Sequence, residues 1–173
     1  YGRVEVAGVI VPGIPVVIAG SNGLVSWGMT NVEGDFLDLV RLDLNPNNAD
    51  EYATPDGWRR FTIRNETIVV KGDRDRVVEI KETLWGPVAE KPLMGHPIAL
   101  RWIALDPDAV DLGLLQMDQA RTVRDAIAVA NRAGGPPNNV VLADADGHIA
   151  WTFMGKIPVR RGFDGSVSVS WAD

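Results

Sequence analysis

Short runs of β-branched residues, separated by turn signals, recur along most of this 173-residue chain. Residues 4–19 are rich in Val and Ile and are interrupted by Pro12-Gly13. Asn22-Gly23 follows, and Asn-Gly readily supplies the positive φ angles of a tight turn. Residues 16–19 and 25–29 are therefore expected to pair as a hairpin. The pattern predicts a fold dominated by antiparallel strands.

Further strands are expected for the same reason. Residues 58–82 alternate between apolar and polar positions around a charged turn at 72–75, which indicates a small antiparallel sheet. A second hairpin is expected around the turn Asp144-Ala145-Asp146-Gly147. Additional strands are expected at residues 39–44 and 98–103.

One segment, residues 107–133, has apolar side chains at roughly helical spacing. Thr122 and Asp125 have the spacing of a helix cap, and Gly134-Gly135-Pro136-Pro137 ends the helix. The expected fold is α+β, predominantly antiparallel β-sheet with one main helix, in a single domain over residues 1–173. Its expected subregions are strand-rich at 47–103, helical at 107–133, and a hairpin with its loop at 139–161.

The composition excludes several classes of protein. The net charge is −6 and the pI about 4.9, which argues against a nucleic-acid partner because phosphate binding needs a basic face. The absence of cysteine excludes a disulfide framework, a thiolate zinc site and a cysteine nucleophile. No apolar run reaches the roughly 20 residues that cross a bilayer. The chain begins at Tyr1 rather than Met, which we interpret as a processed or excised product.

Few residues point to chemistry by spacing alone. The two histidines, His96 and His148, are too far apart in sequence to indicate a metal pair, so a metal-dependent hydrolase has little support. His148 is expected to be an exposed turn residue. Asp35 and Asp38, with the Leu37 carbonyl between them, could hold a hard cation such as calcium. The alternative is a turn with solvated carboxylates.

Asn139 stands at the entry to an apolar strand, directly after two prolines and Asn138. From such a position its amide could donate a hydrogen bond to a developing oxyanion, where one donor can matter by several kcal/mol. The alternative is a turn asparagine that bonds its own backbone. Spacing alone favours the second interpretation.

Taken together, ordered motifs along the chain resemble those of penicillin acylase β-subunits, in the N-terminal-nucleophile hydrolase superfamily. Trp27-Gly28-Met29-Thr30-Asn31 resembles the family's A-W-G-x-T-N. Similar matches are found at Pro12-Gly13-Ile14-Pro15, Gly20-Ser21-Asn22, Asp35 to Asp38-Leu39, Thr83 to Val88, Leu100-Arg101-Trp102, Pro136 to Asn139 and Gly155 to Arg160. The resemblance covers nearly the whole chain and implies a partial αββα-type domain, an internal segment of the β-subunit.

The resemblance also implies a mechanism. In the family an N-terminal serine attacks an amide carbonyl, with its own α-amine as the base. The oxyanion is held by a backbone N–H, here in the region of Asn31 and Val32, and by an asparagine side chain, here Asn139. An arginine, here Arg160 with Arg161 as the alternative, orders the asparagine and the serine amine. The resemblance further implies a structural calcium on Asp35, Leu37 and Asp38 and no organic cofactor.

Three departures from the family pattern limit what this chain can do. The nucleophilic serine is expected upstream of Pro12, and the chain does not reach it. Trp85 and Asn138 replace a histidine and a glutamine of the family. The isolated chain is therefore predicted to be inactive and to need the acylase α-subunit and the rest of the β-subunit as partners. The resemblance implies an acyl-amide substrate, such as a penicillin or an acyl-homoserine lactone, and a periplasmic or extracellular location.

A second hypothesis is a non-catalytic β-rich binding or assembly module that shares only the scaffold. It predicts exposed aromatic side chains lining a groove. The candidates are Trp27, Trp58, Trp85, Trp102, Trp151 and Trp171.

Overall fold

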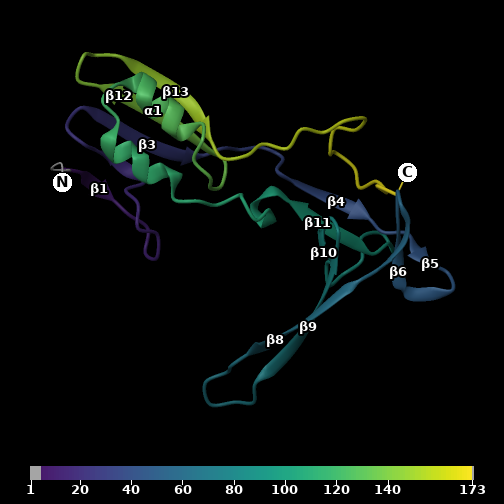
Figure 1. Ribbon diagram of the computed structural model, residues 1–173. Helices are drawn as coiled ribbons and strands as arrows, with labels where there is room; N and C mark the ends of the chain where they lie inside the picture. The colour runs from purple at the N-terminus through teal and green to yellow at the C-terminus, as the bar shows by residue number, and fades with distance from the viewer. Residues whose placement is uncertain (1–4, 173) are drawn as a thin grey trace. The chain divides into compact units, whose positions relative to one another are not determined.

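The computed structural model describes residues 5–172, which are mostly antiparallel strands with few helices, and this confirms the expected α+β class (Figure 1). The chain forms two compact units. The first comprises Tyr1–Gly34 and Asp106–Pro158, the second Asp35–Leu105 and Val159–Asp173. Two compact units can belong to one domain or to two, so a single domain over residues 1–173 stays a prediction. None of the helices within residues 5–172 is long and apolar enough to cross a membrane.

The first unit is built on a five-stranded antiparallel sheet. Its strand order is β1 (Ala7–Val9), β2 (Ala19–Ser21), β3 (Val25–Asn31), β12 (Asn138–Asp144) and β13 (Ile149–Met154). β12 lies between β3 and β13, so residues far apart in sequence are paired. Asn139, for example, lies opposite both Thr30 and Phe153.

Two short helices cover one face of this sheet, η2 (Gly113–Gln119) and α1 (Val123–Ala130) (Figure 1). Val140 and Leu142 of β12 alternate with more exposed residues and pack into a core with Trp27, Met117 and Ala126. Burial of these side chains orients the sheet, because successive strand residues point to opposite faces. Asn139 and Val141 therefore lie on the face away from α1.

The second unit contains three smaller antiparallel sheets. β4 (Leu37–Arg41) pairs with β11 (Ile98–Trp102). β5 (Leu44–Asn45), β6 (Asn48–Thr54) and β7 (Gly57–Arg60) form the second sheet. β8 (Thr62–Ile68), β9 (Arg76–Thr83) and β10 (Gly86–Pro87) form the third, and η1 (Ile103–Leu105) follows β11. A core of Val40, Leu42, Tyr52 and Ala99 joins these elements, with Phe61, Trp85, Val88 and Trp171 packed against it.

The N-terminal hairpin differs from the expectation. Residues 19–21, rather than 16–19, pair with β3, and Gly20 lies opposite Trp27. The reason is packing, because Val16 is buried in the core of the first unit. Val4, at the start of the expected strand run, lies outside the described residues. The second hairpin forms as predicted, with β12 and β13 joined around Asp144 to Gly147.

The helical region is divided rather than continuous. Ala120 is extended after η2, and its carbonyl accepts a hydrogen bond from Asn22 Nδ2 at 2.7 Å. The predicted cap of the second part is confirmed: Asp125 N donates to Thr122 Oγ1, and Thr122 N donates to Asp125 Oδ2. Because Ala120 is extended and Thr122 caps the next helix, α1 begins anew at Val123 and η2 and α1 stay separate.

Candidate functional site

Asn139 is held by three hydrogen bonds at the start of β12. Its amide nitrogen donates to Thr30 Oγ1 at 3.3 Å and to the Asn31 carbonyl at 3.1 Å. The indole N–H of Trp151 donates to its amide oxygen at 3.0 Å. Asn139 therefore bonds neighbouring strands rather than its own turn. That contrasts with Asn138, whose Nδ2 donates to the Pro136 carbonyl in the turn.

The first unit contains an apolar pocket of about 490 Å³; Asn139 does not line it, but Thr30 and Asn31, to which the Asn139 amide donates, do. Thr30, Asn31 and Asn138 contribute its polar edge. The apolar lining includes Val11, Ile14, Val16, Ile18, Met29, Leu114 and Met154. Pockets with mostly apolar walls and a few convergent polar groups are the usual form of small-molecule sites.

Asn31 and Val32 lie where the strand β3 ends. Asn31 is its last residue and is exposed, and Val32 follows half-buried. Within the first unit the structure thus brings Asn31 together with Asn139 through the pairing of β3 with β12.

The predicted calcium ligands and Arg160 meet in the second unit. Arg160 Nε donates to Asp38 Oδ1 at 2.8 Å, and Arg160 Nη2 donates to the Asp35 carbonyl at 3.1 Å and lies 3.2 Å from Asp35 Oδ1. Hydrogen bonding to Asp38 raises the pKa of the Arg160 guanidinium, so this group stays charged. Gly165 is required close by, because a Cβ there would lie 2.6 Å from Arg160 Nε. The single positive charge of the guanidinium is shared between two carboxylates, so a net charge of about −1 remains on this group.

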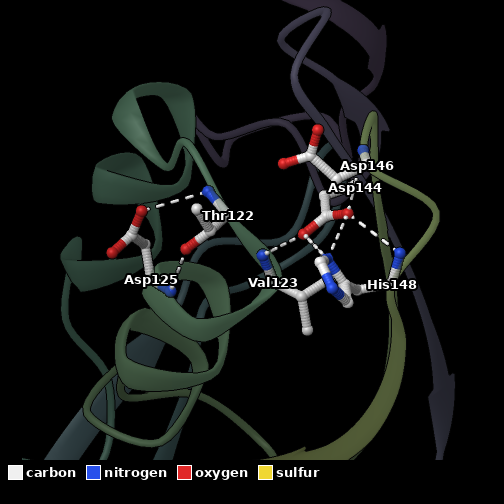
Figure 2. Close-up of polar contacts among 6 residues, drawn as sticks. All are labelled: Thr122, Val123, Asp125, Asp144, Asp146 and His148. Atoms are coloured by element: carbon white, nitrogen blue, oxygen red, sulfur yellow. Dashed lines mark hydrogen bonds and ion pairs between the residues drawn. The ribbon is translucent and has the colours of Figure 1, made fainter.

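At the other end of β12, Asp144 joins the hairpin to the helix α1 (Figure 2). Its Oδ2 accepts from Val123 N at 3.0 Å, and its Oδ1 accepts from Asp146 N at 3.2 Å and from His148 N at 3.0 Å. The Val123 hydrogen bond is the main reason that the pKa of Asp144 is lowered.

His148 is an exposed turn residue, as the sequence indicates, with 71% of its side chain accessible. Its Nδ1 lies 3.1 Å from Asp144 Oδ1. Ligand atoms of Asp144, Asp146 and His148 lie within 4.8 Å of one another. Three backbone N–H groups already occupy the Asp144 oxygens, so the group serves as a structural link between turn and helix.

Sequence reasoning missed two of these residues. In the sequence Trp151 is one of six candidate tryptophans, and Asp144 is part of a turn. Strand alternation could have placed Trp151 on the same face as Asn139 once β12 and β13 were paired. Nothing local to Asp144 indicates Val123 as its donor, because the two are 21 residues apart.

The chain belongs to the penicillin amidase family, whose sequence profile matches residues 1–172. It is 32% identical over 173 residues to the acyl-homoserine lactone acylase QuiP of Pseudomonas aeruginosa, with 92% of this chain and 20% of that protein covered. It is 29% identical to the penicillin acylase 2 proenzyme of a Pseudomonas species, with 91% and 21% covered. The chain therefore spans about a fifth of the length of these relatives.

A solved structure has the same fold. The thermostable penicillin G acylase from Alcaligenes faecalis matches with a TM-score of 0.86 and 27% identity, over 99% of this chain and 32% of that chain. The resemblance inferred from the motifs is thereby confirmed at the level of family and fold.

Proposed function

We propose that this chain is the segment of an acyl-amide hydrolase that supplies oxyanion donors and scaffold. The observation that carries the proposal is the pair of hydrogen bonds from the Asn139 amide nitrogen to Thr30 and Asn31, two residues that line an apolar pocket. In amide hydrolysis, attack on the carbonyl places negative charge on its oxygen. A preorganised N–H donor at that oxygen lowers the barrier by about 3–4 kcal/mol. Asn31 and Val32 are the proposed source of the backbone donor.

The apolar pocket is the proposed site of the acyl chain. Its lining of Val, Ile, Leu and Met side chains suits a hydrocarbon or aryl-acetyl group, and Thr30 and Asn31 mark the end at which the scissile carbonyl would lie. Burial of apolar surface contributes about 25 cal/mol per Å². The pocket is therefore expected to favour apolar acyl groups over charged acyl groups.

The proposed partners are the remaining parts of an acylase, which would bring the serine nucleophile and its amine. The sheet face away from α1 supports this proposal. Three of its side chains are largely exposed, Val141 at 56%, Ile149 at 82% and Trp151 at 59%. Exposed apolar surface of this kind marks interaction sites. A periplasmic or extracellular location stays a prediction from the resemblance.

The alternative, a binding module with an aromatic groove, has less support. Trp27 is 4% exposed, and Trp85 and Trp171 pack against the core of the second unit, whereas Trp58, Trp102 and Trp151 are exposed. None of the six tryptophans lines the pocket described above.

Structural calcium on Asp35, Leu37 and Asp38 is a further proposal, and the residues fit it incompletely. They offer at most five oxygens of the six to eight that calcium takes, and Arg160 already pairs with both carboxylates. Calcium would have to compete with the guanidinium. Arg160→Gln should therefore increase the rise in melting temperature that millimolar CaCl2 produces. Equal responses of the two proteins, or none, would count against the site.

The hydrolase proposal is tested with a phenylacetyl amide chromogen. The purified 173-residue chain is expected to show no turnover, because the proposed serine nucleophile belongs to the remaining parts of the acylase. The complete acylase containing the chain is expected to turn the substrate over and to lose most of its kcat with Asn139→Ala. Turnover by the isolated chain that Asn139→Ala abolishes would mean that the nucleophile has been misplaced.

A further inference from the structure

We propose that Trp151 is a positioning residue that fixes which way the Asn139 amide faces. The inference rests on the proposed oxyanion role of Asn139 and extends it to a second side chain. Trp151 lies on β13 opposite Val141, two positions along from the residue pair Asn139–Phe153. Diagonal neighbours on one face of an antiparallel sheet are within reach of long aromatic side chains.

The chemistry of the indole makes the contact directional. Indole Nε1–H is a donor and has no acceptor capacity, whereas an asparagine amide has one acceptor end and one donor end. Trp151 Nε1 lies 3.0 Å from Asn139 Oδ1, so it can only hold the oxygen end. The Nδ2 end is then directed at Thr30 and Asn31, the polar edge of the pocket.

The indole is 59% exposed and is restrained by one aromatic contact. Its ring contacts Phe153 edge-on, with ring centroids 4.7 Å apart and an angle of 66° between planes. Phe153 lies directly opposite Asn139 in the strand register. Edge-to-face pairs of this geometry are favourable beyond their buried area, so the ring restrains the position of the N–H.

This restraint matters most when the amide changes partners. An oxyanion would accept one of the Nδ2 hydrogen bonds that now go to Thr30 or Asn31. The contacts that hold the donor end of the amide would then be weaker. The Trp151 bond at the oxygen end remains and polarises the amide, since linked hydrogen bonds strengthen one another. A reversed amide would instead present an oxygen to the oxyanion, which is repulsive.

The first experiment uses NMR on the 173-residue chain and does not depend on activity. Trp151→Phe removes the N–H and keeps an aromatic ring. We expect it to shift the Asn139 side-chain NH₂ resonances and to speed their exchange with solvent. Trp58→Phe is the matched control, because Trp58 is similarly exposed at 54% and lies in the second unit. Unchanged Asn139 resonances in Trp151→Phe would overturn the proposal.

The second experiment measures kinetics in the complete acylase. Trp151→Phe is expected to lower kcat about tenfold with KM within about twofold, a smaller loss than the ~10²–10³-fold expected for Asn139→Asp. Asn139→Asp keeps an acceptor for the indole and removes the donor. The double variant should be no slower than Asn139→Asp, because Trp151 acts through Asn139.

The outcomes separate the two proposals. If Asn139→Asp leaves kcat unchanged, the oxyanion role fails and the positioning role fails with it. If Asn139→Asp lowers kcat and Trp151→Phe does not, the oxyanion role stands and Trp151 has no positioning role. A further loss of kcat in the double variant would also contradict the inference.

Discussion

The two ends of strand β12 hold their polar side chains in different ways. At one end, both Asp144 oxygens accept hydrogen bonds from backbone N–H groups, and the side chain is only 3% exposed. At the other end, the half-buried Asn139 is held by two side chains and one carbonyl. Backbone donors cannot be redirected without unfolding, whereas the hydrogens of the Asn139 amide can change partners. The comparison separates a structural link from a group suited to catalysis.

The largest expected effect is on catalysis at the Asn139 end. Asn139→Asp should lower kcat of the complete acylase about 10²–10³-fold, because it replaces the proposed oxyanion donor with a carboxylate. The side chain keeps its size and its acceptor for Trp151, but a carboxylate oxygen then faces the Asn31 carbonyl, so a moderate fall in melting temperature is expected. Steady-state kinetics and thermal unfolding measured on the same preparation test this, and a large fall in melting temperature would make Asn139 a structural residue instead.

The converse substitution at the other end should affect stability. Asp144→Asn keeps one oxygen for the Asp146 and His148 N–H groups but turns an NH₂ toward Val123 N, leaving that N–H without an acceptor. Urea unfolding should show a lower free energy of unfolding, while kcat of the complete acylase is unchanged. If Asp144→Asn lowered kcat without lowering stability, the contrast between a structural Asp144 and a functional Asn139 would be wrong.

The pH dependence of stability should carry the signature of Asp144. Its pKa is lowered from 3.8 in the folded protein, mainly by the Val123 N–H. A lowered folded-state pKa means that the stabilisation is fully present above pH 3.8 and is lost as the pH falls through the folded-state value. As the pH is lowered, the melting temperature should therefore fall less steeply in Asp144→Asn than in wild type. Parallel curves would exclude Asp144 as a source of acid sensitivity.

The smallest effect is expected next to Asp144, at the cap of α1. Thr122→Ala removes the hydroxyl that accepts from Asp125 N and should cost about 1 kcal/mol of unfolding free energy. Thr122→Ser, which retains the hydroxyl, is the control. If Thr122→Ala were more destabilising than Asp144→Asn, the local cap rather than the link to the hairpin would hold the helix start.

Some features could be predicted because they depend on neighbours in sequence. Thr122 and Asp125 are three residues apart, and their reciprocal bonds form as soon as one helical turn does. The turn from Asp144 to Gly147 is similarly local, and Gly147 adopts the positive φ of 87° that such a turn needs. The division of the helical region into η2 and α1 could not be predicted from neighbours in sequence, because Asn22, which bonds the Ala120 carbonyl, is 98 residues away.

The sequence by itself determined the predominance of antiparallel strands, the cap of α1 and the family. These depend on alternation, turn chemistry and ordered motifs, all of which are properties of the chain before it folds. Only the tertiary structure decided what Asn139 contacts. Its bonds to Thr30 and Asn31 span 109 and 108 residues, and the register of β12 between β3 and β13 sets them. A register shift of one residue would turn Asn139 to the other face, so an asparagine that bonds its own turn and one that bonds across strands cannot be told apart until the sheet is assembled.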